Sequence, residues 1–252
     1  PEVKMDLIYS CTKQLSYHEL DFRGLWKPEN IFLTMQEAAA AHAEALGAGY
    51  DALREKNVCW VLIKASLRMN RYPESISTVR ITTWPEPERR MFFPRFFVFE
   101  DEKGEQLGSA STLWTLMDID SRTIVSPAAK GISVDTPEKG PLSIPLPGKI
   151  KLPEGEILHS TLEPKYSDLD INGHVNNSRY IDWLTDRIPL SLFEKGFIGE
   201  LSVSYNKEIR MGETVSLEFS ENNGQFRLAG KCGEQSCFTV NADWRENESA
   251  ES

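Results

Sequence analysis

The sequence predicts an α+β protein built from two repeats of one unit, in which an antiparallel sheet wraps around a central helix. An alanine-rich stretch at 31–53 has the composition of a long helix, and runs of β-branched and aromatic residues follow it at 58–118. A segment rich in proline and glycine then interrupts the chain. After it, the order of strand, helix and strands starts again, which indicates a diverged repeat.

The boundaries of the two repeats follow from that interruption. Prolines and glycines concentrate at 126–155, where they disfavour helix and central strand. We therefore expect an N-terminal domain at 1–125, a linker at 126–155, a C-terminal domain at 156–246 and an acidic tail at 247–252.

In the N-terminal domain, a loose alternation of apolar and polar residues predicts a first strand at 3–17. Asn30 resembles a helix N-cap, so the alanine-rich helix is expected to run from Ile31 to Leu53. Turns rich in proline and glycine separate the runs that follow. The strands expected there are 58–69, 78–84, 90–100 and 106–118.

In the C-terminal domain, the first expected element is a strand at 157–166. Apolar residues then recur at helical spacing, which predicts a helix from Asn177 to about Ile188. The strands expected after this helix are 201–210, 214–220, 225–230 and 237–244.

The repeat is visible in the segments that precede the two helices. Residues 17–24, YHELDFRG, line up with residues 166–173, YSDLDING. The first copy keeps an acid, Asp21, but has Arg23 where the second copy has an amide. We therefore expect the chemistry in the second domain, while the first is free to shape a pocket.

The composition limits the classes of partner. The 252 residues carry a formal net charge of -10, which argues against general binding to nucleic acid or to an anionic membrane. No apolar run approaches the roughly 20 residues of a transmembrane helix, and the N-terminus lacks the features of a signal peptide. A cytoplasmic location is therefore expected. The four cysteines include no C-x-x-C pair and are expected to be reduced structural thiols.

An acid, an amide and an imidazole occupy every second position before the second helix: Asp170, Asn172 and His174. Alternate side chains of an extended segment point the same way, so the three would share one face near a helix N-terminus. The N–H groups of a helix N-terminus suit an oxygen that becomes negative during a reaction. This combination predicts a hydrolytic site without a serine or cysteine nucleophile.

The same segment also matches the first half of a calcium-binding EF-hand loop, at Asp168, Asp170, Asn172 and Gly173. The twelfth position of such a loop should be a glutamate, but here it is Arg179, whose charge would repel the metal. We therefore expect neither a metal nor a cofactor.

Residues 167–184, SDLDINGHVNNSRYIDWL, closely resemble the signature of the plant and bacterial acyl-acyl-carrier-protein thioesterases. Residues 205–208, YNKE, resemble the tyrosine–basic–basic–glutamate strand of that family, with Asn206 in place of one basic residue. Further similarity lies at Asn70-Arg71-Tyr72-Pro73, Thr83-Trp84 and Ser111-x-x-Trp114, so the resemblance covers about Met5 to about Phe219. The family fold is two tandem hotdog domains, in agreement with the repeat. The chain starts directly at the first domain, as a bacterial member would.

The resemblance implies hydrolysis of the thioester that links a fatty acyl chain to the phosphopantetheine arm of acyl carrier protein. Free fatty acid is released, which ends chain elongation in fatty acid biosynthesis. The family's catalytic positions correspond to Asp170, Asn172, His174 and Glu208. Asp170 would activate water or attack the carbonyl itself, and Glu208 would share in proton handling. Asn172 and His174 would orient the water and Asp170. Some members have a cysteine after the glutamate, but Ile209 excludes a thiol nucleophile at that position.

The acyl chain requires an apolar tunnel, which we expect in the N-terminal domain, between the helix at 31–53 and the strands at 58–69 and 90–100. Acyl carrier protein is acidic, so its docking requires a local basic patch despite the net charge. The candidates near the motif are Lys165, Arg179, Arg187, Lys207 and Arg210.

Several alternatives stay open. An acyl-coenzyme A thioesterase is the main enzymatic alternative, because hotdog sites hydrolyse both carriers. A hotdog dehydratase fits the Asp-x-Asn-x-His motif less well. A non-catalytic acyl-binding module is the alternative from another class. The sequence leaves the acyl chain length and the oligomeric state open, a homodimer included.

Overall fold

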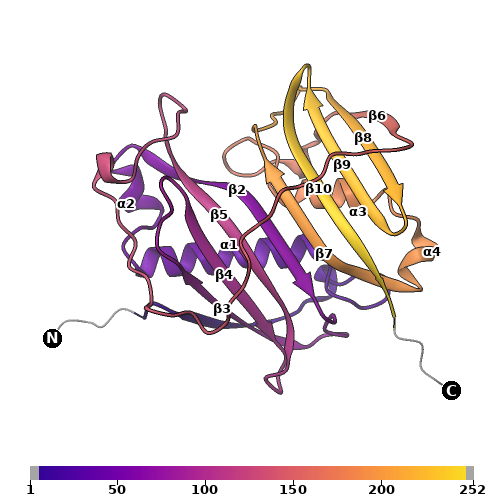
Figure 1. Cartoon of the computed structure of the whole chain (residues 1–252), viewed down its shortest axis with the longest axis horizontal. Coiled ribbons are helices and arrows are strands. Elements are labelled where there is room, and N and C mark those ends of the chain that lie inside the picture. The colour runs from indigo at the N-terminus through magenta and orange to yellow at the C-terminus, as the bar shows by residue number, and fades with distance from the viewer. Residues whose placement is uncertain (1–5, 248–252) are drawn as a thin grey trace. The chain divides into compact units, whose positions relative to one another are not determined.

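The computed structural model describes residues 6–247, which form two compact units that meet between Pro147 and Gly148 (Figure 1). The first three residues of the predicted strand at 3–17, and residues 248–252 of the predicted tail, lie outside this range. Within it, no helix combines the length and the apolar character that crossing a membrane demands.

The N-terminal unit is an antiparallel sheet with the strand order β1-β3-β4-β5-β2. A long helix, α1, contacts β1 and β3. The strands are β1 (Tyr9–Gln14), β2 (Val58–Met69), β3 (Thr78–Pro85), β4 (Phe93–Glu100) and β5 (Gln106–Asp118). The helices are α1 (Pro28–Ala45), α2 (Tyr50–Arg54) and two short 3-10 helices, η1 (Tyr17–Glu19) and η2 (Ala128–Lys130).

The helix predicted at 31–53 is two helices in the structure. α1 begins three residues before Ile31, because Pro28 occupies its first position, where the fixed φ of proline fits the helix and no N–H is needed. Asn30 is not the N-cap, since it lies inside α1, where its side-chain amide donates to the Glu19 carbonyl oxygen. Gly47, with a φ of +70°, ends the helical path before α2 starts at Tyr50.

Strand β4 is buried along almost its whole length because both of its faces are covered. Phe97 and its alternate neighbours face α1, as the contact of Phe99 with Trp26 and the bond between Arg95 and His42 show. On the opposite face, Phe96 and Val98 pack with Trp84 against residues of the segment that follows η2, namely Ile144 and Leu146. The proline-rich segment therefore contributes to the core of this unit, and each aromatic residue buried there contributes about 2 kcal/mol.

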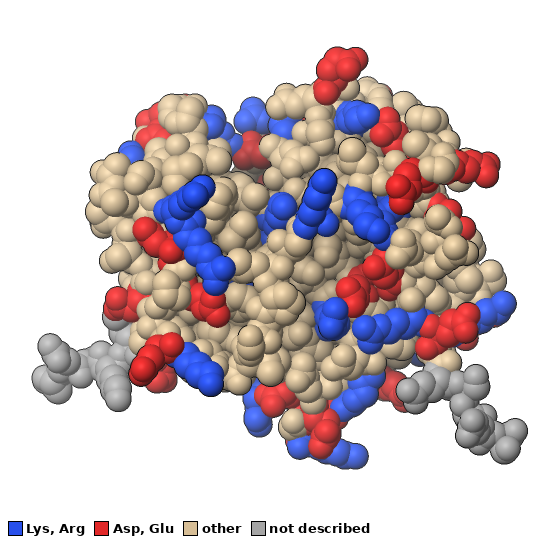
Figure 2. All heavy atoms as spheres, viewed as in Figure 1, with Lys and Arg blue, Asp and Glu red and all other residues tan. Residues whose placement is uncertain are grey.

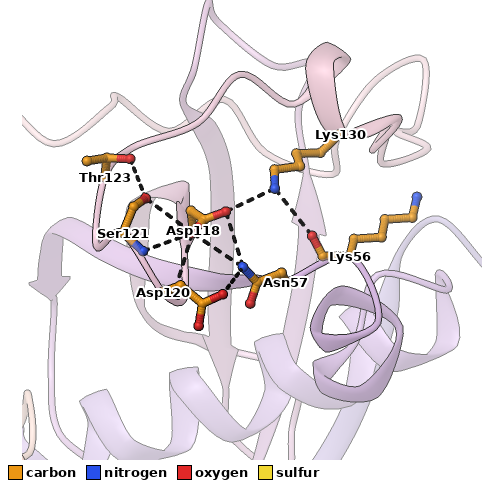
Figure 3. A network of polar contacts seen from close by, with 7 residues as sticks. All are labelled: Lys56, Asn57, Asp118, Asp120, Ser121, Thr123 and Lys130. Carbon is orange, nitrogen blue, oxygen red and sulfur yellow. Dashed lines mark hydrogen bonds and ion pairs between the residues drawn. The ribbon is translucent and has the colours of Figure 1, made fainter.

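A polar network at one end of the N-terminal sheet holds the start of the proline-rich segment (Figure 3). Asp118, the last residue of β5, accepts the backbone N–H groups of Asp120 and Ser121 through Oδ1, at 3.2 and 3.0 Å. Its Oδ2 accepts Lys130 Nζ at 3.0 Å. Asn57, after α2, donates to Asp120 Oδ2 at 2.8 Å. The network thus joins the ends of β2 and β5 to η2.

The C-terminal unit repeats the arrangement, with the antiparallel order β7-β10-β9-β8-β6 and a central helix, α3, that contacts β9 and β10. The strands are β6 (Leu158–Leu162), β7 (Gly196–Tyr205), β8 (Val215–Asn222), β9 (Gln225–Cys232) and β10 (Gln235–Glu246). The helices are η3 (Tyr166–Asp168), α3 (Arg179–Thr185) and α4 (Leu190–Phe193).

The central helix of this unit is shorter than predicted. The sequence predicts a helix from Asn177 to about Ile188, whereas α3 has only seven residues. Asn176 holds the chain in a turn before it, by accepting the Ser178 N–H through its side-chain oxygen at 2.9 Å. α3 is nevertheless well anchored, because the buried ring of Tyr180 stacks on Phe238 with centroids 4.3 Å apart.

The network around Asp118 generates a prediction about pH. The Ser121 N–H and the Lys130 ammonium lower the pKa of Asp118 from 3.8 to about 2. Because the folded state binds this proton less readily than the unfolded state, the carboxylate stabilises the fold above pH 4. That contribution is lost as the pH falls from about 4 towards 2. We expect Asp118→Asn to unfold at lower urea concentration than the wild type at pH 7, and the difference to shrink below pH 4. If the urea midpoints of Asp118→Asn and the wild type differed equally at pH 7 and at pH 2.5, the stabilisation would come from the shape of the side chain and not from its charge.

Candidate active site

The loop that follows η3 is a tight turn and not an extended segment. The Asp170 N–H donates to the His174 carbonyl oxygen at 2.8 Å, and the Gly173 N–H donates to the Asp170 carbonyl oxygen at 3.0 Å. Leu169 and Val175 pair as an antiparallel bridge at its base. Gly173 has a φ of +73°, which a residue with a side chain rarely adopts. The predicted alternation along a strand is therefore wrong, and the turn brings the polar groups together instead.

The Asp170 carboxylate stabilises this turn from within. Its Oδ1 accepts the backbone N–H of Asn172 at 2.8 Å and that of His174 at 3.3 Å. Its Oδ2 lies 3.5 Å from the Asn172 side-chain nitrogen. Asp170 is half-buried and Asn172 is exposed. One carboxylate oxygen thus orients the backbone, while the other lies beside an exposed amide.

Tertiary structure brings Glu208 to the same place. The loop after β7 pairs with the Asp170 turn, through an antiparallel bridge between His174 and Arg210 and a 2.8 Å bond from the Val175 N–H to the Ile209 carbonyl oxygen. This pairing places Glu208 Oε2 3.2 Å from His174 Nε2. The His174 side chain is 16% exposed and that of Glu208 is 36% exposed, so water reaches the pair. All four residues predicted from the sequence therefore gather in the C-terminal unit.

The contact with Glu208 orients the imidazole of His174. A carboxylate only accepts hydrogen bonds unless it is protonated, so the proton between the two groups belongs on Nε2 of the ring. Arg210 is 63% exposed and its guanidinium lies 3.9 Å from the same Glu208 oxygen. At that distance and exposure, the arginine contributes little to holding the glutamate.

A buried acid that the sequence did not indicate as part of the site supports the turn. Asp168 is 4% exposed, accepts the Lys165 N–H at 2.7 Å and accepts Arg179 Nε at 2.9 Å. Arg179 also forms an ion pair with Asp182. These contacts fasten η3 to the first turn of α3, on either side of the Asp170 turn. The signal was present in the repeat, because the equivalent Glu19 is also buried and accepts the N–H three residues earlier.

The N-terminal unit forms the same turn without the same chemistry. Asp21 Oδ1 accepts the N–H groups of Arg23 and Leu25 at 2.8 and 3.1 Å, and Gly24 has a φ of +81°. The Arg23 guanidinium lies 2.7 Å from Asp21 Oδ2. In the second copy the equivalent oxygen, Asp170 Oδ2, lies beside the Asn172 amide instead. The turn is therefore common to both repeats, but an arginine binds the acid in the first.

Aromatic side chains pack near the Asp170 turn. Tyr205 donates its hydroxyl to the Asn177 carbonyl oxygen at 3.2 Å, and its ring lies 5.8 Å from that of Tyr180. Burial raises the pKa of both phenols, and the nearby acids Glu208 and Asp170 add to the effect on Tyr180. Both tyrosines are therefore neutral at pH 7, and they act as a rigid wall.

Some of the N–H groups near the start of α3 are already engaged in hydrogen bonds within the chain. The Ser178 N–H donates to Asn176 Oδ1 and the Arg179 N–H donates to the Asn176 carbonyl oxygen, each at 2.9 Å. α3 also begins at Arg179, two positions later than the predicted start at Asn177. Within residues 6–247, no three His, Cys, Asp or Glu side chains are grouped in a way that could hold a metal.

Two successive antiparallel sheets, each packed on a central helix, define a double hotdog protein, as the fold of related structures confirms. Models of the N-terminal and C-terminal domains of the acyl-ACP thioesterases match residues 6–129 and 153–246. The chain belongs to the acyl-ACP thioesterase family.

Solved structures of similar proteins include an acyl-ACP thioesterase from Bacteroides thetaiotaomicron. Its TM-score is 0.87 at 27% identity, over 94% of this chain and 98% of that one. The 12:0-ACP thioesterase of Umbellularia californica has the same fold, with a TM-score of 0.77 at 21% identity, over 96% and 98% of the two chains.

Curated relatives are chloroplast enzymes of plants. An acyl-[acyl-carrier-protein] hydrolase of Cuphea viscosissima is 28% identical over 214 residues, which are 78% of this chain and 51% of the relative. A palmitoyl-acyl carrier protein thioesterase of Gossypium hirsutum is 27% identical over 248 residues, which are 93% and 60% of the two. The chain therefore spans between half and two thirds of the length of these relatives.

Asp168 provides a test of how the loop is held. We expect Asp168→Asn to lower the free energy of unfolding by about 2 kcal/mol, because asparagine has no charge to pair with Arg179 and only one oxygen to accept the two bonds from Lys165 and Arg179. Turnover should fall as well, since the turn loses one of its anchors. Urea unfolding and kcat measure the two effects. Arg210→Ala is the matched control, since its exposed contact with Glu208 should change stability by less than about 0.5 kcal/mol. Wild-type stability of Asp168→Asn would contradict the anchoring role.

Proposed function

We propose that this protein hydrolyses the thioester of fatty acyl-acyl carrier protein and releases free fatty acid. The observation that carries the proposal is the convergence of Asp170, Asn172, His174 and Glu208 within one loop pair of the C-terminal unit. Family membership and the hydrolase names of the plant relatives support the same activity. The released fatty acid would no longer be available for elongation.

Asp170 is the group we assign to the attack. Its Oδ1 is engaged by two backbone N–H groups, which leaves Oδ2 to accept a proton from water or to attack the carbonyl carbon directly. Hydrogen bonds to Oδ1 fix the carboxylate before the substrate arrives, so little reorganisation is required during the reaction. The Asn172 side chain lies beside Oδ2 and is exposed, so its amide can orient the water or polarise the thioester oxygen.

The His174–Glu208 pair is the second half of the proposed mechanism. The Glu208 carboxylate, 3.2 Å from Nε2, orients the ring and leaves Nδ1 as the nitrogen that can accept a proton. When water is the nucleophile, the single proton that it releases to Asp170 can pass to Nδ1 of the ring and from there to the departing thiolate of the carrier. General acid–base steps of this kind contribute roughly a hundred- to ten-thousand-fold in rate.

We assign the acyl chain to the N-terminal unit and catalysis to the C-terminal unit. The residues of α1 that face its sheet are largely apolar, Ile31 and Met35 among them, and Phe97 of β4 faces the helix. These apolar side chains suit contact with a fatty acyl chain better than contact with a polar ligand. We assign catalysis to the second copy because, in the first copy, Arg23 forms an ion pair with Asp21, the residue equivalent to Asp170.

The carrier protein is the proposed partner, and the structure narrows the set of basic residues that could meet it. Of the five candidates, Arg179 and Lys207 are already ion-paired with acids, and Arg187 donates to the Trp183 carbonyl oxygen. Lys165 and Arg210 are exposed. Basic and acidic side chains are interspersed on the face drawn in Figure 2. The proposed docking patch for the carrier protein is therefore a small group of basic residues and not a broad basic surface.

A cytoplasmic location fits the state of the thiols. Within residues 6–247 no disulfide joins the four cysteines, which are Cys11, Cys59, Cys232 and Cys237. Reduced cysteines are the rule in a reducing compartment such as the cytoplasm.

The catalytic assignment predicts the effect of three substitutions. Asp170→Asn and His174→Ala should each lower kcat by about a hundred- to ten-thousand-fold, and Glu208→Gln should lower it less, because it acts through the histidine. The readout is release of fatty acid from acyl-acyl carrier protein. Asp21→Asn is the matched control, since it alters the same turn in the repeat that lacks the catalytic set, and its kcat should stay within about threefold of wild type. Near-wild-type turnover of folded Asp170→Asn would refute the assignment.

The choice of carrier has its own test. If acidic carrier protein docks near Lys165 and Arg210, kcat/KM for acyl-acyl carrier protein should fall steeply between 50 and 300 mM salt. Hydrolysis of a small acyl thioester should change little over the same range. Lys165→Glu should weaken the salt dependence without altering hydrolysis of the small thioester. Equal kcat/KM for the coenzyme A and carrier-protein thioesters would instead indicate an acyl-coenzyme A thioesterase. Binding of the acyl thioester without release of fatty acid would indicate a non-catalytic acyl-binding module.

A further inference from the structure

Two tight turns of the C-terminal unit each expose an apolar side chain beside the proposed catalytic groups. The first turn, residues 170–173, is closed by a 3.0 Å hydrogen bond from its last N–H group to its first carbonyl oxygen, and Ile171 is its second residue. The second turn, residues 210–213, is closed in the same way at 3.3 Å, and Met211 is its second residue. Ile171 is 95% exposed and Met211 is 58% exposed.

The pairing of the two loops brings these turns to one place. His174 and Arg210 form an antiparallel bridge, so the residue after Arg210 lies opposite the residue before His174. Met211 is therefore opposite Gly173, where the first turn ends. Ile171 lies within that first turn. Both apolar side chains thus belong to the surface around the proposed catalytic residues.

The first copy shows that the fold does not require an apolar residue at the position of Met211. Single exposed apolar residues are ordinary on protein surfaces, so exposure alone does not imply a role. In the N-terminal unit, the bridge between Leu25 and Glu74 corresponds to the one between His174 and Arg210. The residue after Glu74 is Ser75, which is exposed and polar.

The other apolar tip also differs between the copies. The position of Ile171 is Phe22 in the N-terminal unit. The Arg23 guanidinium lies 5.8 Å from the centre of the Phe22 ring, and Phe22 is 66% exposed. The first copy therefore partly covers its apolar tip with a side chain of the same turn, whereas Ile171 is almost fully exposed to water.

The charges beside the tips differ between the copies in the same direction. Lys165 corresponds to Ser16, because each donates its backbone N–H to the buried acid three residues later. Arg210 corresponds to Glu74 through the equivalent bridges. All four residues are exposed. A neutral residue and an acid in the first copy are thus two basic residues in the second.

These differences identify the kind of partner that the surface fits. Apolar side chains with a polar, charged border are typical of protein interfaces, and basic charges at the border favour an acidic partner. Acyl carrier protein is acidic and must bring its thioester to this surface. An anionic membrane fits less well, because a protein with a net charge of -10 is repelled by an extended surface of the same sign.

We propose that Ile171 and Met211 are the apolar contacts of the docking surface for acyl carrier protein, with Lys165 and Arg210 at its charged border. This inference rests on the proposed function and extends it, because affinity then depends on the burial of two particular apolar side chains as well as on charge. Ile171 and Met211 bind the carrier and take no part in the chemistry.

The test is calorimetric titration with acyl carrier protein whose arm holds the acyl chain through an amide, which resists hydrolysis. Ile171→Ser and Met211→Ser should each raise Kd about five- to tenfold, because less apolar surface is removed from water on binding. Salt does not screen apolar contacts, so the factor should be the same at about 50 and about 300 mM salt. The effect of Lys165→Glu should instead shrink at the higher concentration.

Phe22→Ser is the matched control, since it makes the equivalent change in the copy without the catalytic set, and its Kd should stay within about twofold of wild type. Wild-type Kd values for both Ile171→Ser and Met211→Ser would overturn the proposal. If the wild type neither binds nor hydrolyses acyl-acyl carrier protein, the proposed function fails. If it does both and the two serine variants bind equally well, only the docking role fails.

A second measurement uses the unaltered protein. Methionine methyl groups are isotopically labelled for NMR, and the Met211 signal is identified by its absence from the spectrum of Met211→Leu. Addition of the same carrier protein should shift or broaden the Met211 signal. The signal of Met91, an exposed methionine of the N-terminal unit, should stay unchanged. A perturbed Met91 signal with an unperturbed Met211 signal would place the carrier on another surface and overturn the proposal.

Discussion

The hydrogen bonds from the Asn172 and His174 N–H groups to Asp170 Oδ1 are the constraint on which the rest of the site depends. They close the turn, and with Gly173 in the left-handed region they set the direction in which the Asn172 and His174 side chains leave it. The same carboxylate has a second oxygen beside the Asn172 amide. One acid can thus hold the backbone and take part in chemistry, because its two oxygens are used separately. Packing of the loop after β7 then adds Glu208.

The repeat shows how a hotdog unit can gain or lose this chemistry without losing its shape. Asp21 closes the same turn through the same oxygen, and Gly24 has the same backbone conformation. The acids before the two turns, Glu19 and Asp168, are both buried and both accept a backbone N–H. The backbone turn is therefore shared by the two copies. The residues after the acid differ, so Asp21 is bound to an arginine, whereas Asp170 lies next to an amide and a histidine.

Buried charges in the two units are handled in different ways. Asp168 and Arg227 each have a partner of opposite charge, which offsets the cost of removing them from water. Arg95 has only neutral partners among the described residues, and its bond to His42 connects the central helix to the sheet.

Local sequence was sufficient for much of this structure. The 2.0-residue alternation and the turn residues located most strands, and the D-x-N-G-H spacing together with the repeat identified Asp170, Asn172 and His174, because these features act within a few residues of each other. Four features became visible only in the folded structure. Gly47 divided the predicted helix, and the turn replaced the expected strand, because backbone hydrogen bonds outweigh side-chain periodicity over such short segments. Glu208 reached His174, and Arg95 reached His42, only through the pairing of segments far apart in the chain. Periodicity along one segment carries no information about which distant segment will pack against it.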